Sequence, residues 1–141
     1  MAKFTLDSLD SSDADFLLIG MSSHAKIYRL CWSLNQHMNL KLINSNTTIE
    51  LPGTKKQLKN TFEVYKYFDE VSRIDYHIIP NKSGNGFLLP EFKHIDYLML
   101  LKENLEINLS EVITKAKLSD QVLMAFEINI EEVNSIENLL F

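Results

Sequence analysis

Successive short β-type runs fill residues 40–101, and this constrains the fold more than any other feature. Phe62–Phe68 alternates as a strand does, and Arg73–Ile79 is rich in aromatic and β-branched residues. The four residues between these runs predict an antiparallel hairpin. Leu40–Asn44 and Thr47–Leu51 predict two further strands before it.

A helix is predicted over His24–Met38. Its apolar residues fall at i, i+3, i+4, i+7 and i+11, which places them on one helical face; they are Ile27, Leu30, Cys31, Leu34 and Met38. Ser22 and Ser23 are suitable N-caps. Asn39 is suited to end the helix, because Asn tolerates the left-handed conformation of a C-terminal cap.

The remaining patterns complete an α+β fold. They predict strands at Asp15–Met21, Ile95–Leu101 and Val122–Ile128, a helix at Glu111–Leu118 capped by Ser110, and a terminal helix at Ile130–Leu139. We therefore expect an antiparallel-rich mixed sheet of about five to seven strands, with two or three helices packed on it. The strand–helix–strand opening is compatible with a right-handed crossover that places two strands parallel, and the strand order is left open.

The length of 141 residues fits one domain. We expect residues 1–14 to form a polar leader or an edge strand, and residues 15–141 to form a single globular α+β domain. Cys31 is the lone cysteine and lies on the apolar helical face, so it is expected to be an unreactive core residue. The acidic start is unlike a secretory signal, and a cytoplasmic location is expected.

Charge disfavours nucleic acid as a partner. The net charge is −5, whereas neutralising phosphates requires positive surface. The charge is uneven, because residues 21–102 carry eleven Lys or Arg against seven Asp or Glu, while both ends are acidic. The apolar runs are too short to span a bilayer. A protein is therefore the expected partner, with the oligomeric state left open.

Motifs for cofactor or metal chemistry are missing from the sequence. The four histidines lack the spacing that places two metal ligands on one helical face, and Ser83–Gly86 continues into no phosphate-binding pattern. No serine occupies a nucleophile elbow. We expect no cofactor and no metal, and the sequence leans away from an enzyme without deciding the matter.

The most distinctive segment is Leu89–Leu100. Pro90, Glu91, Asp96 and Tyr97 resemble the signature of the IPExxxDY family, which comprises small uncharacterised bacterial proteins of the Bacteroidota. Leu89 replaces the initial Ile, and four residues rather than three separate Glu91 from Asp96. Residues 28–42 also resemble the family's first helix and the strand after it. The resemblance implies relatives but no established activity.

Two functions from different classes use these candidate residues. A non-enzymatic interaction or regulatory module would dock through Arg29, Trp32, His37 and the Glu91–Tyr97 segment, since Trp and Arg are favoured interface anchors. Trp32 could instead close the core. A small enzyme or ligand-binding domain would need Asn35, His37, Glu91 and Tyr97 to line one pocket. The candidate residues are Arg29, Trp32, Asn35, His37, Glu91, Asp96 and Tyr97.

A weaker alternative is an RNA-binding sheet. Aromatic residues fall on the two strands of the predicted hairpin, and exposed aromatics can stack on single-stranded bases; they are Phe62, Tyr65, Tyr67, Phe68 and Tyr76. Packing between neighbouring strands explains the same residues and is the favoured interpretation.

Overall fold

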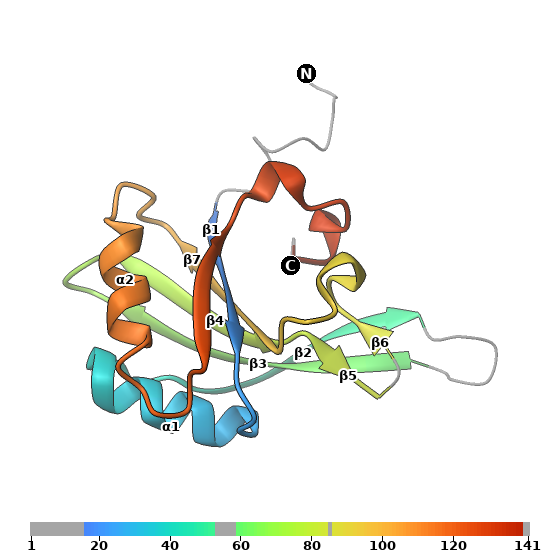
Figure 1. Cartoon of the computed structure of the whole chain (residues 1–141), viewed down its shortest axis with the longest axis horizontal. Coiled ribbons are helices and arrows are strands. Elements are labelled where there is room, and N and C mark those ends of the chain that lie inside the picture. The colour runs from blue at the N-terminus through green and yellow to red at the C-terminus, as the bar shows by residue number, and fades with distance from the viewer. Residues whose placement is uncertain (1–15, 53–58, 85, 140–141) are drawn as a thin grey trace.

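A six-stranded antiparallel sheet runs through the molecule (Figure 1). The computed structural model describes residues 16–52, 59–84 and 86–139, so the predicted leader over 1–14 lies outside the described residues. The strands follow the order β2-β3-β4-β7-β1-β8. They are β1 (Phe16–Ser22), β2 (Ile43–Pro52), β3 (Lys59–Asp69), β4 (Ile74–Pro80), β7 (Tyr97–Lys102) and β8 (Met124–Ile128). The α+β prediction is confirmed.

Every neighbouring pair in this sheet is antiparallel. The predicted hairpin is β3–β4, in which Tyr67 lies opposite Tyr76. Alternating directions make β1 and β2 run the same way, and β3, β4 and β7 separate them. A small second sheet pairs β5 (Lys82–Ser83) with β6 (Gly86–Phe87).

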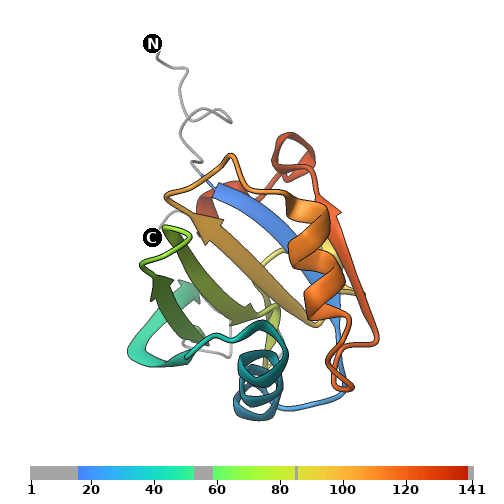
Figure 2. The same cartoon turned by 90° about the vertical axis from the view of Figure 1, so that its left-hand side faces the viewer.

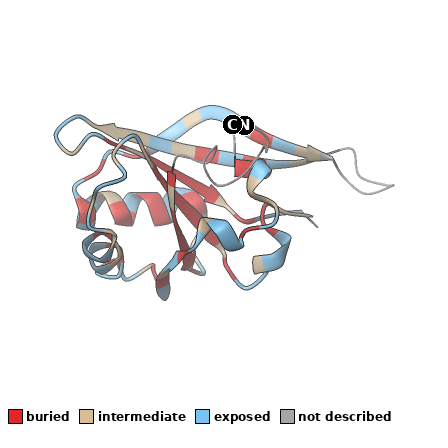
Figure 3. Ribbon diagram, turned by 90° about the horizontal axis from the view of Figure 1, so that it is seen from above, coloured by how far each residue is buried: buried red, intermediate tan, exposed pale blue. Residues whose placement is uncertain are grey.

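Both α-helices in the described part of the chain cover one face of the sheet (Figure 2). Helix α1 (Ile27–Met38) buries its predicted apolar stripe against β1, β4 and β7, and α2 (Leu109–Ala116) buries Val112 and Ala116. Buried residues accordingly concentrate on the central strands and on one side of α1 (Figure 3).

The opposite face of the sheet is covered by irregular segments. The short 3₁₀ helices η2 (Pro90–Phe92), η3 (Ile130–Glu132) and η4 (Ile136–Leu139) pack here with Leu88 and Leu89. Strand β7 is therefore covered on both sides, and its residues from Tyr97 to Leu101 are all buried. This explains why β7 is a continuous apolar run in the sequence rather than an alternating one.

The predicted helix limits require three corrections. Helix α1 begins at Ile27 rather than His24, with Lys26 at its N-cap, because Ser22 ends β1 and the Ser23 hydroxyl accepts from the Ala25 N–H. Asn39 ends the helix as predicted, with φ 57° and ψ 47°. Helix α2 is capped by the Asn108 side chain, which accepts from the Glu111 N–H, and not by Ser110.

The third correction concerns the C-terminus. The terminal helix predicted at Ile130–Leu139 is replaced by η3 and η4, with Val133 extended between them. The apolar spacing of three residues that suggested an α-helix also matches the period of a 3₁₀ helix. Likewise, the two strands predicted between residues 40 and 51 form one strand, β2, whose register shifts between Asn44 and Thr48.

Candidate functional site

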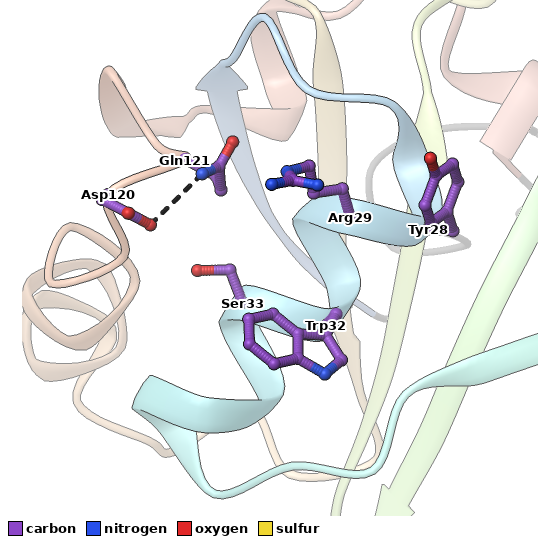
Figure 4. Close-up of a pocket in the computed structure, with 6 residues that line it drawn as sticks. All are labelled: Tyr28, Arg29, Trp32, Ser33, Asp120 and Gln121. Carbon is purple, nitrogen blue, oxygen red and sulfur yellow. Dashed lines mark hydrogen bonds between the residues drawn. The ribbon is translucent and has the colours of Figure 1, made fainter.

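A surface hollow of about 440 Å³ lies between α1 and the loop that follows α2 (Figure 4). We call it the Trp32 hollow; its lining residues are Tyr28, Arg29, Trp32, Ser33, Asp120 and Gln121. Four of these come from two successive turns of α1, and the other two come from a segment about ninety residues later in the sequence. The fold therefore creates this site by bringing distant segments together.

A buried serine pair joins the two walls. The hydroxyl oxygens of Ser33 and Ser119 lie 2.6 Å apart, and both residues are buried. The Ser119 hydroxyl also accepts from the Gln121 N–H at 3.1 Å. Because the loop is hydrogen-bonded to the helix and to itself, the hollow has a fixed floor.

Exposed aromatic side chains line the α1 wall of the hollow. Trp32 is 65% exposed and Tyr28 is 60% exposed, and their spacing of four residues places them on one side of α1. Leu118 and Leu123, which are also mostly exposed, flank the loop wall in the sequence. The alternative in which Trp32 closes the core is therefore wrong, because the helix turns its other side to the sheet.

The guanidinium of Arg29 projects across the hollow toward Gln121 (Figure 4). Among the described residues it makes no side-chain hydrogen bond or ion pair within the usual distances, and it is exposed. On the opposite wall, the Gln121 amide donates to Asp120 Oδ1 at 3.3 Å. The hollow thus combines aromatic surface with a cation whose donors are available to a ligand.

Asn35 and His37 lie farther along α1 and serve the helix itself. The Asn35 amide accepts from the Leu42 N–H at 2.9 Å and donates to the Leu42 carbonyl at 3.2 Å, which fastens the chain leaving α1. His37 Nδ1 donates to the Ser33 carbonyl at 3.0 Å while the side chain remains exposed. Neither residue lines the Trp32 hollow.

Glu91 is engaged on the opposite face of the sheet. Its carboxylate accepts from the Ser135 hydroxyl at 2.7 Å and from the Ser135 N–H at 3.0 Å. Partial burial raises the pKa of Glu91, but these hydrogen bonds outweigh burial, so its pKa lies below the ordinary value. Glu91 therefore holds the C-terminal segment between η3 and η4 against η2.

Asp96 and Tyr97 hold the segment that leads into α1. Asp96 Oδ2 accepts from the Ser23 N–H at 2.8 Å, and the Tyr97 hydroxyl donates to the Ala25 carbonyl. Burial, together with the Asp96 carboxylate, raises the pKa of Tyr97 to about 12. The distinctive segment thus connects β7 to the start of α1 through hydrogen bonds inside the protein.

The four residues proposed to line one pocket have no hydrogen-bonding partner in common. Asn35 bonds to Leu42, His37 to Ser33, Glu91 to Ser135 and Tyr97 to Ala25. Glu91 and Tyr97 also pack on opposite faces of the sheet. Within the described ranges, no three His, Cys, Asp or Glu side chains gather in a way that could hold a metal ion.

The aromatic residues of the β3–β4 hairpin are buried or partly buried by packing within the protein. Phe62 and Tyr76 are buried on opposite faces of the sheet, and Tyr65 and Tyr67 pack partly buried against the α1 side. Burial raises the pKa of Tyr76 to about 12. Phe68 contacts Arg73, whose guanidinium carbon lies 5.1 Å from the ring centre. Phe62 and Tyr76 are thereby withdrawn from solvent, whereas Tyr65, Tyr67 and Phe68 keep part of their surface exposed.

Sequence reasoning missed the structural role of Asn81. This residue is fully buried, and its amide bonds to Leu89, Phe92 and Ile95. Sequence reasoning also missed Tyr28 and Gln121 as residues that line the Trp32 hollow. Tyr28 carried a signal, since it lies one helical turn before Trp32, but nothing local marks Gln121.

Comparison with known proteins adds no relative: no known protein family, curated protein or solved structure matches the chain. The part of the chain that the structure describes holds no helix with the length and apolar character needed to cross a bilayer.

Proposed function

We propose that this protein is a non-enzymatic interaction module that docks on a partner protein through the Trp32 hollow. The observation that carries the proposal is the 65% exposure of Trp32 beside the hollow. An exposed indole on a folded helix gains from burial against a partner, and Trp, Tyr and Arg are the residue types enriched at interface hot spots. Trp32, Tyr28 and Arg29 supply all three.

Packing inside the molecule gives no reason for Tyr28 and Trp32 to be aromatic. The apolar stripe of α1 already fills the space over the sheet without them, and an exposed Trp or Tyr adds little to folding stability. A rigid platform favours docking, because ordering a flexible surface on binding costs free energy. The serine pair Ser33–Ser119 supplies that rigidity.

Site-specific crosslinking tests this proposal. A photoreactive phenylalanine analogue would replace Tyr28, and the control would carry it at Val71, which is 93% exposed in the β3–β4 turn and lies outside the hollow. In cells of the native source, we expect a discrete crosslinked protein from position 28 that disappears when Trp32→Ala is added. Identical crosslinks from both positions, or persistence in the Trp32→Ala background, would contradict the proposal.

We further propose that the chain belongs with the IPExxxDY proteins and acts in the cytoplasm. The hydrogen bonds of Glu91, Asp96 and Tyr97 support the first point, because they give a structural reason for such a motif to persist. The buried free thiol of Cys31 is compatible with a reducing compartment. Fluorescence microscopy of the tagged full-length chain tests the location.

A further inference from the structure

We infer that the Trp32 hollow binds an acidic segment of the partner, which places a carboxylate on Arg29 and an apolar side chain against Trp32. This inference rests on the proposed docking function and adds the chemistry of the partner. It is carried by three observations: the cationic residues on and beside α1, the Arg29 guanidinium, which pairs with no described residue, and the exposed aromatic side chains of the hollow.

The sequence around α1 is free of acidic residues. From Phe16 to Ile49 there is no Asp or Glu, whereas Lys26, Arg29 and Lys41 are all present. All three are exposed. In a protein whose net charge is −5, this stretch therefore presents only cationic charges at the surface, with Asp120 as the acidic residue that also lines the hollow. Such a surface attracts acidic partners and repels basic ones, which affects both the rate and the specificity of docking.

Arg29 provides the directional contact. A guanidinium presents a planar array of donors that matches a carboxylate in a bidentate arrangement. In many proteins an exposed Arg is paired with a neighbouring Asp or Glu, but no such pair joins Arg29 to any described residue. Its donors face the hollow (Figure 4) and are available to a carboxylate from outside.

Asp120 sets the position of that carboxylate. It is the acidic residue in the wall of the hollow, and its Oδ1 already accepts from Gln121. A partner carboxylate would be repelled at this wall and attracted at the Arg29 wall. We therefore expect one acidic residue of the segment to lie on the Arg29 side, with an aliphatic or aromatic residue next to it on Trp32.

Panning a random peptide library on the full chain tests the inference. Trp32→Ala protein serves for counter-selection, so only peptides that need Trp32 are retained. Enriched peptides are then synthesised twice, once as selected and once with every Asp and Glu changed to Asn and Gln. Binding is followed by the emission of Trp32, which is the chain's single tryptophan.

We expect the retained peptides to contain Asp or Glu beside an apolar residue. We expect the amide versions to bind about 10-fold more weakly or worse, since a charged hydrogen bond is lost. The Arg29→Gln protein should show a similar loss of affinity for the selected peptides. It should bind the selected peptides and their amide versions about equally. Lys41→Gln, a cation outside the hollow, should cost less than about 3-fold, because exposed charges interact weakly.

The other outcomes separate the two claims. Retained peptides that are neutral or basic, or that bind Arg29→Gln unchanged, overturn the acidic-segment inference and leave docking intact. Failure to retain any Trp32-dependent peptide counts against both. A shift of Trp32 emission with protein concentration alone, matched by a dimer in sedimentation, would assign the hollow to a second copy and overturn the inference. A comparable shift of Trp32 emission with single-stranded RNA would also overturn the inference.

Discussion

Replacement of Asn81 by Ala should destabilise this protein more than any replacement of an exposed polar residue. Asn81 is fully buried, and its side chain makes three hydrogen bonds: one from the Leu89 N–H at 2.8 Å, and two to the carbonyls of Phe92 and Ile95 at 2.8 and 3.1 Å. Truncation would leave three backbone groups without their partner.

The size of the effect follows from the burial of those groups. An unsatisfied buried donor or acceptor costs about 1–3 kcal/mol. The groups at Leu89 and Ile95 lie in fully buried contacts, whereas the contact at Phe92 is partly open to water. We therefore expect a loss of about 3–5 kcal/mol, a large share of the roughly 5–15 kcal/mol that stabilises a typical domain.

Urea unfolding followed by circular dichroism measures this loss. With an m-value of about 2 kcal/mol/M, the midpoint should fall by about 2 M. The matched control is Asn104→Ala, which removes two less buried hydrogen bonds, one to the Ser72 carbonyl at 2.8 Å and one from the Glu106 N–H at 3.0 Å, and should cost about 1–2 kcal/mol. Equal losses for Asn81→Ala and Asn104→Ala would refute the argument that burial of the orphaned groups sets the cost.

Three further outcomes are expected. Gly20→Ala should lower stability by about 1–3 kcal/mol in the same urea assay, because its new methyl would lie 2.9 Å from the Cδ1 atoms of Ile95 and Ile128. Cys31 should not react with Ellman's reagent until the protein unfolds, since burial shields the thiol and raises its pKa. Burial, more than the neighbouring charges, lowers the pKa of His77, so folding favours its neutral form. Stability should therefore decline as pH falls below about 6.5, and His77→Asn should flatten the decline between pH 7 and pH 5.

Periodic patterns predicted the parts of the fold in which one face is buried. The stripe of α1 and the β3–β4 hairpin were found because burial on one side imposes a repeat of 3.6 or 2 residues. The limits of α1 were less well predicted, since Ser22 and Ser23 had the right chemistry for capping but were already used by β1 and by the Asp96 contact. Tertiary hydrogen bonds overrode the local preference.

Asn81 shows what periodic patterns cannot predict. Its sequence neighbours suggest a turn, and Asn is common in turns for local reasons. Here the side chain satisfies backbone groups eight to fourteen residues later, in a segment that folds back over the sheet. Such a role depends on where that segment lies, and nothing in the local sequence encodes it. Gln121 escaped prediction for the same reason.

The candidate residues divide according to whether their polar atoms are already used. The Asn35 side chain hydrogen-bonds to the segment that leaves α1. The side chains of Asp96 and Tyr97 hydrogen-bond to the segment that enters it. Fixing both ends of the helix fixes the direction in which Trp32 and Arg29 project, although neither of these makes such a bond to the described chain. A side chain that stabilises the fold needs its partner inside the protein, whereas one selected for docking must leave its surface uncovered. The distinctive Asp96–Tyr97 pair therefore supports the helix, and it would contribute to the proposed docking only indirectly, through the orientation that it gives to the Trp32 hollow.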